Sequence, residues 1–181
     1  MRTMVNIETG WKEISGANTI LLVASHNYPH VRNANLKPAD VGTGKIVEKY
    51  CSEFNCWGLI SSKVQLDPNW YANSPFREMV KEIIDKRQVT VVLDIHGRKI
   101  DCKNLIEFFP NNSFGKRKCL ADLVVKEFVD NEQLTIVEDL DNYKVPGVEI
   151  EIRKDGRVKA INASNYSKAQ VILRDVLTGL L

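Results

Sequence analysis

The sequence predicts an α/β fold, a three-layer α/β/α sandwich with a mixed, mostly parallel central sheet. Short apolar runs rich in β-forming residues alternate along the chain with longer segments whose apolar residues recur at helical spacing. One run, QVTVVLDI at 88–95, is almost continuously apolar, as expected for a central strand covered on both faces. Strands that alternate with helices favour a sheet with helices on both of its faces.

The same patterns give the individual elements. Strands are expected at 18–25, 57–63, 88–95, 104–110 and 147–153, helices at 42–54, 74–87, 116–131 and about 165–179, and a further element at 133–139. The helix at 74–87 has the clearest start, because Ser74 suits an N-cap and Pro75 suits the first helical position. No repeat, linker or low-complexity tract interrupts the chain, so residues 1–181 are expected to form a single domain.

Composition argues against several classes of partner. The chain has 25 Lys and Arg against 23 Asp and Glu, and its basic residues are scattered except for GKRK at 115–118. This balance gives no support to a nucleic-acid or membrane-surface partner. No stretch approaches the roughly 18 apolar residues of a membrane span, and the amino end lacks an apolar leader core, so a cytoplasmic location is expected. The four cysteines, Cys51, Cys56, Cys102 and Cys119, form no close CxxC pair and are expected to be reduced and mostly buried.

Two of the three histidines stand where buried strands end. His26 follows the apolar run at 18–25, and His96 follows the run at 88–95. A single histidine in such a place is usually hydrogen-bonded or solvent-facing. Sites in open α/β sheets lie beyond the carboxyl ends of the strands, so two equivalent histidines can converge there. One carboxylate would complete a three-ligand zinc site with a position open for water.

Three carboxylates are candidates near these histidines. Asp40 lies just before the helix at 42–54, where an N-cap role would explain it equally well. Asp94 is two residues before His96, so both side chains leave an extended strand on the same face. That spacing suits a carboxylate that orients the imidazole from behind. In the late strand VEIEIR, alternation puts Glu151 on one face with neighbouring charged residues, a pattern that a solvated face also produces.

The ordered motifs resemble those of the N-formylglutamate amidohydrolase-like proteins. They are SHN after an apolar strand, then DVGTGKIV, VQLDPN, LDIHG and VEIEIR, and together they span about residues 20–155. The sequence is also similar to the wider zinc carboxypeptidase and poly-γ-glutamate hydrolase group, in which an acid followed by GT and a late E-aliphatic-R recur. The resemblance implies a three-layer α/β fold and a single zinc ion held by His26, Asp40 and His96, with Glu151 as the general base.

The resemblance also implies a reaction and a substrate class. The reaction is the zinc-dependent hydrolysis of an amide bond in an N-acyl amino acid or in a small γ-glutamyl or peptide substrate. Asn69, in LDPNW, corresponds to the polar residue of the family's DxN segment. Arg32, Arg77 and Arg153 are candidate holders of a substrate carboxylate, because a guanidinium can grip a carboxylate with two parallel hydrogen bonds. The expected partner is therefore a small molecule that carries a carboxylate.

Two alternatives stay open at the level of sequence. His30 follows His26 closely enough to replace Asp40 as the third ligand, although Pro29 between the histidines argues against a regular helix there. The protein could also keep the fold, with or without the metal, lack hydrolytic activity and bind a small acidic ligand or a protein partner. The orientation of Glu151 toward or away from the metal separates these two functions. Iron or cobalt would suit the same ligands as zinc.

Overall fold

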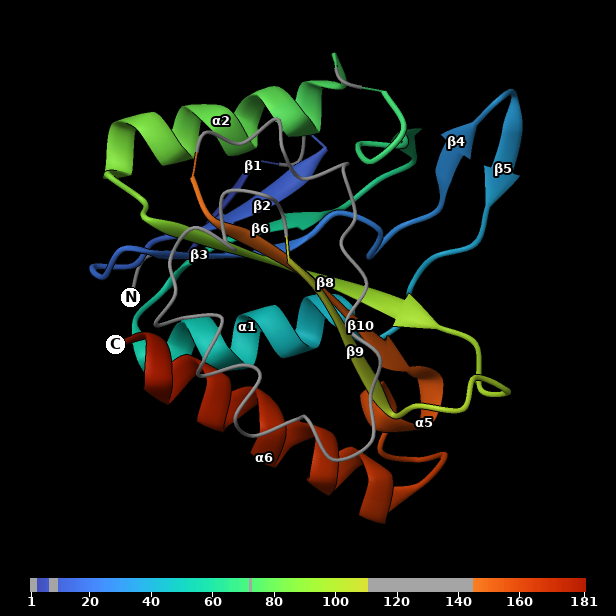
Figure 1. The fold of residues 1–181 in the computed structure, drawn as a ribbon. Helices are drawn as coiled ribbons and strands as arrows, with labels where there is room; N and C mark the ends of the chain where they lie inside the picture. The colour runs from blue at the N-terminus through green and yellow to red at the C-terminus, as the bar shows by residue number, and fades with distance from the viewer. Residues whose placement is uncertain (1–2, 7–9, 72, 111–144) are drawn as a thin grey trace.

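A computed structural model of the protein describes residues 3–6, 10–71, 73–110 and 145–181 (Figure 1). Two of the expected elements, the helix at 116–131 and the element at 133–139, lie outside the described residues, as do Cys119 and the GKRK segment.

The described residues form a seven-stranded central sheet with the order β1-β2-β6-β3-β8-β10-β9. The strands are β1 (Thr3–Asn6), β2 (Trp11–Ile14), β3 (Ile20–Ala24), β6 (Trp57–Ser61), β8 (Val91–Arg98), β9 (Ile106–Pro110) and β10 (Gly147–Arg153). The four middle strands β6, β3, β8 and β10 run parallel to their neighbours among these four, whereas β1, β2 and β9 pair antiparallel at the two edges. The expected mixed sheet is confirmed.

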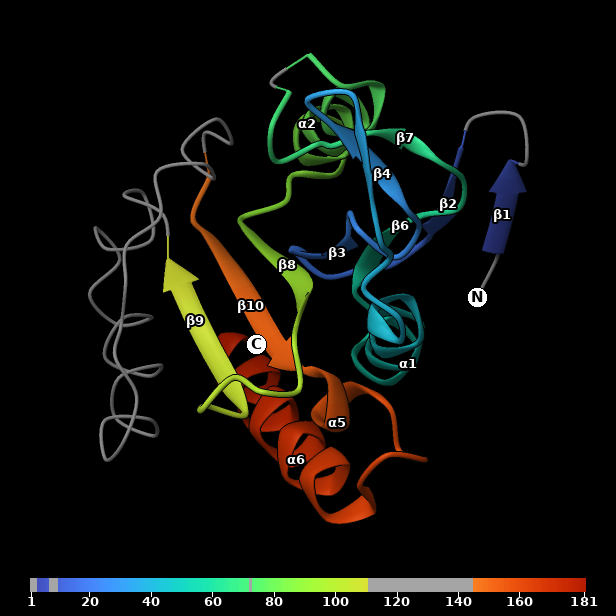
Figure 2. The ribbon, with the colours of Figure 1, turned by 90° about the vertical axis from the view of Figure 1, so that its right-hand side faces the viewer.

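Helices cover both faces of this sheet (Figures 1 and 2). Helices α1 (Thr43–Phe54) and α6 (Ala163–Leu180) lie against one face, and α2 (Pro75–Arg87) lies against the other. Strand β8 shows how the sequence supports two cores, because Leu93 and Ile95 pack toward α1 and α6 while Val92 packs toward α2. The expected three-layer α/β/α arrangement is confirmed.

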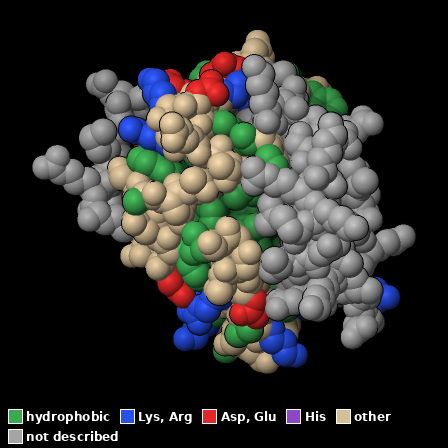
Figure 3. Space-filling view, turned by 60° about the vertical axis from the view of Figure 1, so that its left-hand side comes forward, with side chains coloured by type: hydrophobic (Ala, Val, Ile, Leu, Met, Phe, Trp, Pro, Cys, Tyr) green, Lys and Arg blue, Asp and Glu red, His purple; other side chains and the backbone are tan. Residues whose placement is uncertain are grey.

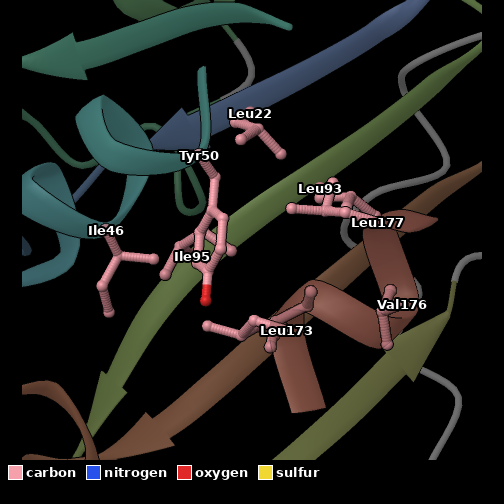
Figure 4. Close-up of a pocket in the computed structure, with 9 residues that line it drawn as sticks. Leu22, Ile46, Tyr50, Leu93, Ile95, Leu173, Val176 and Leu177 are labelled. Carbon is pink, nitrogen blue, oxygen red and sulfur yellow. The ribbon is translucent and has the colours of Figure 1, made fainter. Parts of the chain in front are cut away.

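The core under α1 and α6 contains a small apolar cavity of about 10 Å³ (Figure 4). Ile46 and Tyr50 of α1 line it together with Leu22 of β3 and Leu173 of α6. Burial raises the pKa of Tyr50, and its hydroxyl donates a hydrogen bond of 2.6 Å to the carbonyl of Gln170. The Tyr50 hydroxyl therefore has a hydrogen-bond partner, and the cavity is a packing space between the helices and the sheet.

A second sheet stands beside the central one. Strands β4 (His30–Arg32), β5 (Asn35–Lys37) and β7 (Gln65–Leu66) form it in the order β5-β4-β7. Strands β4 and β5 form a hairpin whose turn residues Asn33 and Ala34 have positive φ values of 49° and 60°. These strands are absent from the elements that the sequence predicts. These strands matter for the site because β4 carries His30 and Arg32.

The surface carries charges of both signs. Figure 3 shows one face, on which Lys, Arg, Asp and Glu side chains gather at the upper and lower ends with hydrophobic side chains between them. In the described part of the chain, no helix is both long and apolar enough to cross a membrane.

Helix α2 begins where the sequence predicts. The Ser74 side chain accepts a hydrogen bond of 3.2 Å from the backbone N–H of Arg77, and Pro75 takes the first helical position. Ser74→Ala should lower the free energy of unfolding by about 1 kcal/mol, because a backbone donor at the helix start loses its acceptor. Urea unfolding measures this loss, with Ser52→Ala on the exposed side of α1 as the matched control. Equal losses in both variants would contradict the cap.

Candidate metal centre

Three of the expected site residues converge beside the carboxyl ends of the central strands. Nδ1 of His26 and Nδ1 of His96 each lie 3.7 Å from Oδ2 of Asp40. The ligand atoms of these three residues lie within 4.8 Å of one another. Both histidines are buried, and Asp40 is partly exposed. Tetrahedral zinc with bonds of about 2.0–2.1 Å places neighbouring donor atoms roughly 3.4 Å apart, so this group has the spacing of a ligand set.

Asp40 does not cap helix α1. The N-cap is Gly42, in the left-handed region with φ 98°, and no side chain accepts a hydrogen bond there. The N-cap expectation is therefore wrong, because the turn at Gly42 starts the helix beyond Asp40 and leaves the carboxylate to other contacts. Its Oδ2 accepts a hydrogen bond of 2.9 Å from the backbone N–H of Gly97. Burial alone would raise the pKa of Asp40, but the imidazoles of His26 and His96 outweigh burial and hold that pKa below its usual value.

The second ring nitrogen of His26 is held by a carboxylate that is not among the residues expected from the sequence. Nε2 of His26 lies 2.9 Å from Oδ1 of Asp67, which is fully buried. Asp67 also accepts hydrogen bonds from Nε of Arg32 at 2.6 Å and from the backbone N–H of Asn69 at 2.9 Å. Burial would raise the pKa of Asp67, but His26 and Arg32 lower it. The available signal for this residue was the aspartate of the LDPN motif itself, two residues before Asn69.

The second ring nitrogen of His96 has a similar environment. Nε2 of His96 lies 3.1 Å from Oδ2 of Asp94 and 3.3 Å from Oγ of Ser25. Nδ2 of Asn69 also lies 3.1 Å from Nε2, but an amide nitrogen only donates, so Asp94 is the acceptor for an Nε2–H proton. Burial would lower the pKa of His96, but the charges of Asp94 and Glu149 outweigh it and raise that pKa. Asp94 thus lies behind the imidazole, in the place that its spacing from His96 predicts.

These contacts fit the two imidazoles to a metal ion. A carboxylate that accepts the Nε2–H proton favours the tautomer whose lone pair is on Nδ1. Both Nδ1 atoms face Asp40, and together they offer two nitrogen donors and one oxygen donor of the type that zinc takes. Protons and a metal ion compete for the same Nδ1 atoms.

The two carboxylates behind the imidazoles give a direct prediction. Asp67→Asn keeps the shape of the side chain but places an amide donor where Nε2–H needs an acceptor. We expect its zinc affinity to fall by roughly 10- to 100-fold, and Asp94→Asn to behave alike through His96. Competition with a chromophoric chelator measures the affinities, and Asp175→Asn, exposed on α6, is the matched control. Unchanged affinity in both site variants would contradict the arrangement.

His30 lies next to His26, but its orientation does not suit binding of the same metal ion by both imidazoles. Nε2 of His30 lies 3.4 Å from Oδ2 of Asp67, so His26, His30 and Asp67 form a second group with ligand spacing. The rings of His30 and His26, however, are stacked with centroids 3.8 Å apart and planes 11° apart. A cation lies close to the plane of each imidazole that binds it, and two parallel stacked rings cannot both meet that condition. The rings of His26 and His96 are inclined by 83°. The geometry favours Asp40 over His30 as the third donor.

Glu151 lies on strand β10, beside His96. The parallel register pairs Glu151 with His96, so both side chains leave the same face of the sheet. Oε2 of Glu151 forms an ion pair of 2.9 Å with Nε of Arg98, which also pairs with Glu107 of β9. Burial and the charge of Glu149 raise the pKa of Glu151. Arg98, which is not among the residues expected from the sequence, thus holds the proposed base.

The three arginines expected to hold substrate lie in different surroundings. Arg32, on β4, has a side chain that is 33% exposed, and its guanidinium lies 5.1 Å above the ring of Trp70. Arg77 is buried, and its Nη1 donates a hydrogen bond of 3.0 Å to the carbonyl of Pro68, inside the loop that carries Asp67.

Arg153 is the last residue of β10, two residues after Glu151. Its Nε donates a hydrogen bond of 2.8 Å to Asp155, and its Nη1 donates to the carbonyls of Cys102 and Lys103 at 3.1 Å each. These contacts give Arg153 a structural task, as the contact with Pro68 does for Arg77. A role of either residue in substrate binding stays a prediction.

Solved structures resemble this chain over nearly its whole length, although no family model and no curated protein matches its sequence. A gene product of Agrobacterium tumefaciens is 16% identical, with 99% of this chain and 98% of that one covered and a TM-score of 0.64. N-formylglutamate amidohydrolase from Ralstonia eutropha is 11% identical, with 94% and 95% covered and a TM-score of 0.58. A bacteriophage poly-γ-glutamate hydrolase is 16% identical, with 97% and 87% covered and a TM-score of 0.54. The chain therefore has the fold of N-formylglutamate amidohydrolase and poly-γ-glutamate hydrolase, and the resemblance carried by its motifs is confirmed at the level of the fold.

Proposed function

We propose that this protein is a zinc-dependent hydrolase that cleaves the amide bond of an N-acyl amino acid or of a small γ-glutamyl or peptide substrate. The observation that carries the proposal is the convergence of Nδ1 of His26, Nδ1 of His96 and Oδ2 of Asp40, with each Nε2 held by a buried carboxylate. The fold of two hydrolases named for amide substrates supports it. One domain over residues 1–181 and a cytoplasmic location belong to the same proposal.

In this proposal His26, His96 and Asp40 hold the zinc ion. When bound, zinc supplies Lewis-acid activation of a water molecule and of the substrate carbonyl. Asp67 and Asp94 keep the two imidazoles in the tautomer and ring orientation that ligation requires.

Glu151 is the proposed general base. It accepts a proton as the water oxygen bonds to the amide carbon, and it delivers that proton to the nitrogen as the carbon–nitrogen bond breaks. Burial and Glu149 raise the pKa of Glu151, which strengthens it as a base and readies it to act as an acid afterwards. Arg98 orients the carboxylate through the contact of its Nε with Oε2.

Arg32 is the proposed anchor for a substrate carboxylate. Arg32 donates its hydrogen bond to Asp67 through Nε. Among the described residues, neither Nη group of Arg32 has a hydrogen-bond partner, so both are available to bind a carboxylate with two parallel hydrogen bonds. Asp67 holds both Arg32 and His26, which fixes the anchor relative to the metal ligands. Asn69, next to His96 in the same loop as Asp67, is the proposed polar contact to the substrate.

A second candidate function is the binding of a small acidic ligand without hydrolysis. The ion pair between Arg98 and Glu151 favours it, because a guanidinium held against a carboxylate weakens that carboxylate as a base. Metal analysis of the purified protein and hydrolysis assays with N-formyl, N-acetyl and γ-glutamyl amino acids test both functions. About one zinc per chain together with hydrolysis supports the enzyme. Stoichiometric zinc without hydrolysis of any substrate supports the binding function, and absence of bound metal contradicts the enzyme.

A further inference from the structure

Arg157, in the short helix α5 (Lys154–Arg157), is a buried arginine that donates to three backbone carbonyls. Its Nε donates to Ile152 at 2.8 Å, its Nη1 to Val41 at 2.7 Å and its Nη2 to Arg98 at 3.1 Å. Figure 2 shows α5 below the carboxyl end of β10. The guanidinium of Arg157 therefore joins three segments that are far apart in the sequence.

Each of the three segments carries one of the proposed site residues. Val41 directly follows Asp40, and Ile152 directly follows Glu151. The third carbonyl, at the end of β8, lies two residues after His96. The guanidinium of Arg157 thus contacts the backbone close to the proposed metal ligands Asp40 and His96 and to the proposed base Glu151.

Gly97 of β8, next to Arg98, leaves room for the guanidinium of Arg157. A Cβ atom on Gly97 would lie 2.4 Å from Cζ of Arg157 and 2.5 Å from each of its Nη atoms. Gly42, in the turn before α1, is similarly close, because its Cβ would lie 2.9 Å from the carbonyl oxygen of Arg157. Both chain segments approach Arg157 more closely than any residue with a side chain allows.

A buried guanidinium is a costly way to fill this space. Among the described residues, no carboxylate accepts a hydrogen bond from Arg157, and burial lowers its pKa while the charge of Asp40 acts in the opposite direction. An apolar side chain would fill the volume without that desolvation. An apolar side chain would not donate to the three carbonyls, whereas the rigid guanidinium fork does.

We propose that Arg157 is a positioning residue that fixes the separation of Asp40, His96 and Glu151 by holding the backbone next to each of them. The inference rests on the proposed metal site and extends it to a residue outside the ligand set and the expected motifs. Its role is indirect, because Arg157 contacts carbonyls of the three segments and none of the three side chains is among its hydrogen-bond partners in the described part of the chain.

Two substitutions test the inference. Arg157→Lys keeps the charge but has a single ammonium group in place of the fork, and Arg157→Met keeps an unbranched chain of similar length without charge. We expect folded variants to lose roughly tenfold or more in Zn²⁺ affinity and to show shifted visible absorption bands when loaded with Co²⁺. Arg174→Lys and Arg174→Met, at an exposed arginine paired with Glu53, are the matched controls. Wild-type affinity and an unchanged Co²⁺ spectrum in Arg157→Lys would overturn the inference.

A double substitution tests whether the guanidinium of Arg157 fills the space above Gly97. Gly97→Ala should lower the melting temperature in the wild-type background, and the loss should shrink by at least half in the Arg157→Met background, where a flexible thioether replaces the rigid fork. Equal losses in the two backgrounds would show that Arg157 does not occupy the space above Gly97 and would overturn the inference.

The imidazole NMR signals of metal-free protein separate a failure of this inference from a failure of the proposed function. If the wild type binds no metal, the proposed function fails. The ring signals of His26 and His96 should still move in Arg157→Lys and stay in place in Arg174→Lys. Ring signals that stay in place in both variants would overturn the positioning role, whatever the wild type binds.

Discussion

Replacing His96 with alanine is expected to remove most of the bound zinc. Two remaining protein ligands rarely hold this ion, so the loss should be close to complete after dialysis. His26→Ala should behave in the same way, because its Nδ1 lies as far from Asp40 as that of His96. Metal content per chain, measured on protein whose folding is checked by circular dichroism, gives the result. Full retention of metal in either variant would reject the site.

The third ligand is tested with the same measurement. Asp40→Ala is expected to lose zinc, because it removes the oxygen that both Nδ1 atoms face. His30→Ala is expected to keep zinc, because a ring stacked flat on His26 is in the wrong plane to share its ion. The opposite pair of results would make His30 the third ligand and contradict the assignment of Asp40.

The parallel part of the central sheet was predictable because its signals are local, whereas the edge strands β1 and β2 are not among the expected elements. The run at 88–95 is apolar at nearly every position, and the structure places β8 in the middle of the sheet with a core on each face. The start of α2 was predictable for a related reason, since an N-cap serine and a following proline act on adjacent backbone groups. The histidines at the strand ends then followed from the general position of sites in open α/β sheets.

The small sheet and the residues around the ligands were not predictable in this way. Strands β4, β5 and β7 have two or three residues each, too few to show a period of two. Their pairing sets His30 onto His26 and brings Arg32 to Asp67, and neither contact leaves a trace in local spacing.

Arg98 and Arg157 show the same limit within other elements. Arg98 meets Glu151 because β8 and β10 are neighbours in the sheet, although they are far apart in the chain. Arg157 lies in a four-residue helix that no periodicity marks, and its partners are backbone carbonyls, which every residue has. Side-chain type at one position cannot reveal a contact whose other half carries no side-chain signal.

Glu151→Gln is expected to lower hydrolysis of N-acyl amino acids by roughly 10²-fold or more, because the amide cannot accept the proton that a positioned general base removes. Zinc binding should be unchanged. The side-chain oxygen of glutamine can still accept from Nε of Arg98, so the local packing of β10 is retained. Turnover rates measured on variants with equal zinc content give the result.

Glu149→Gln is the control that separates a base from a nearby charge. Glu149 shares the strand face of Glu151, and its charge raises the pKa of both Glu151 and His96. Its loss should lower the pKa of the base and slow hydrolysis by a few-fold at most, since Glu151 stays in place to take the proton. An equal loss in the two variants would mean that the reaction senses the summed negative charge of the strand face. A zinc-loaded wild type that hydrolyses none of the substrates would leave ligand binding as the better account of why Arg98 holds Glu151.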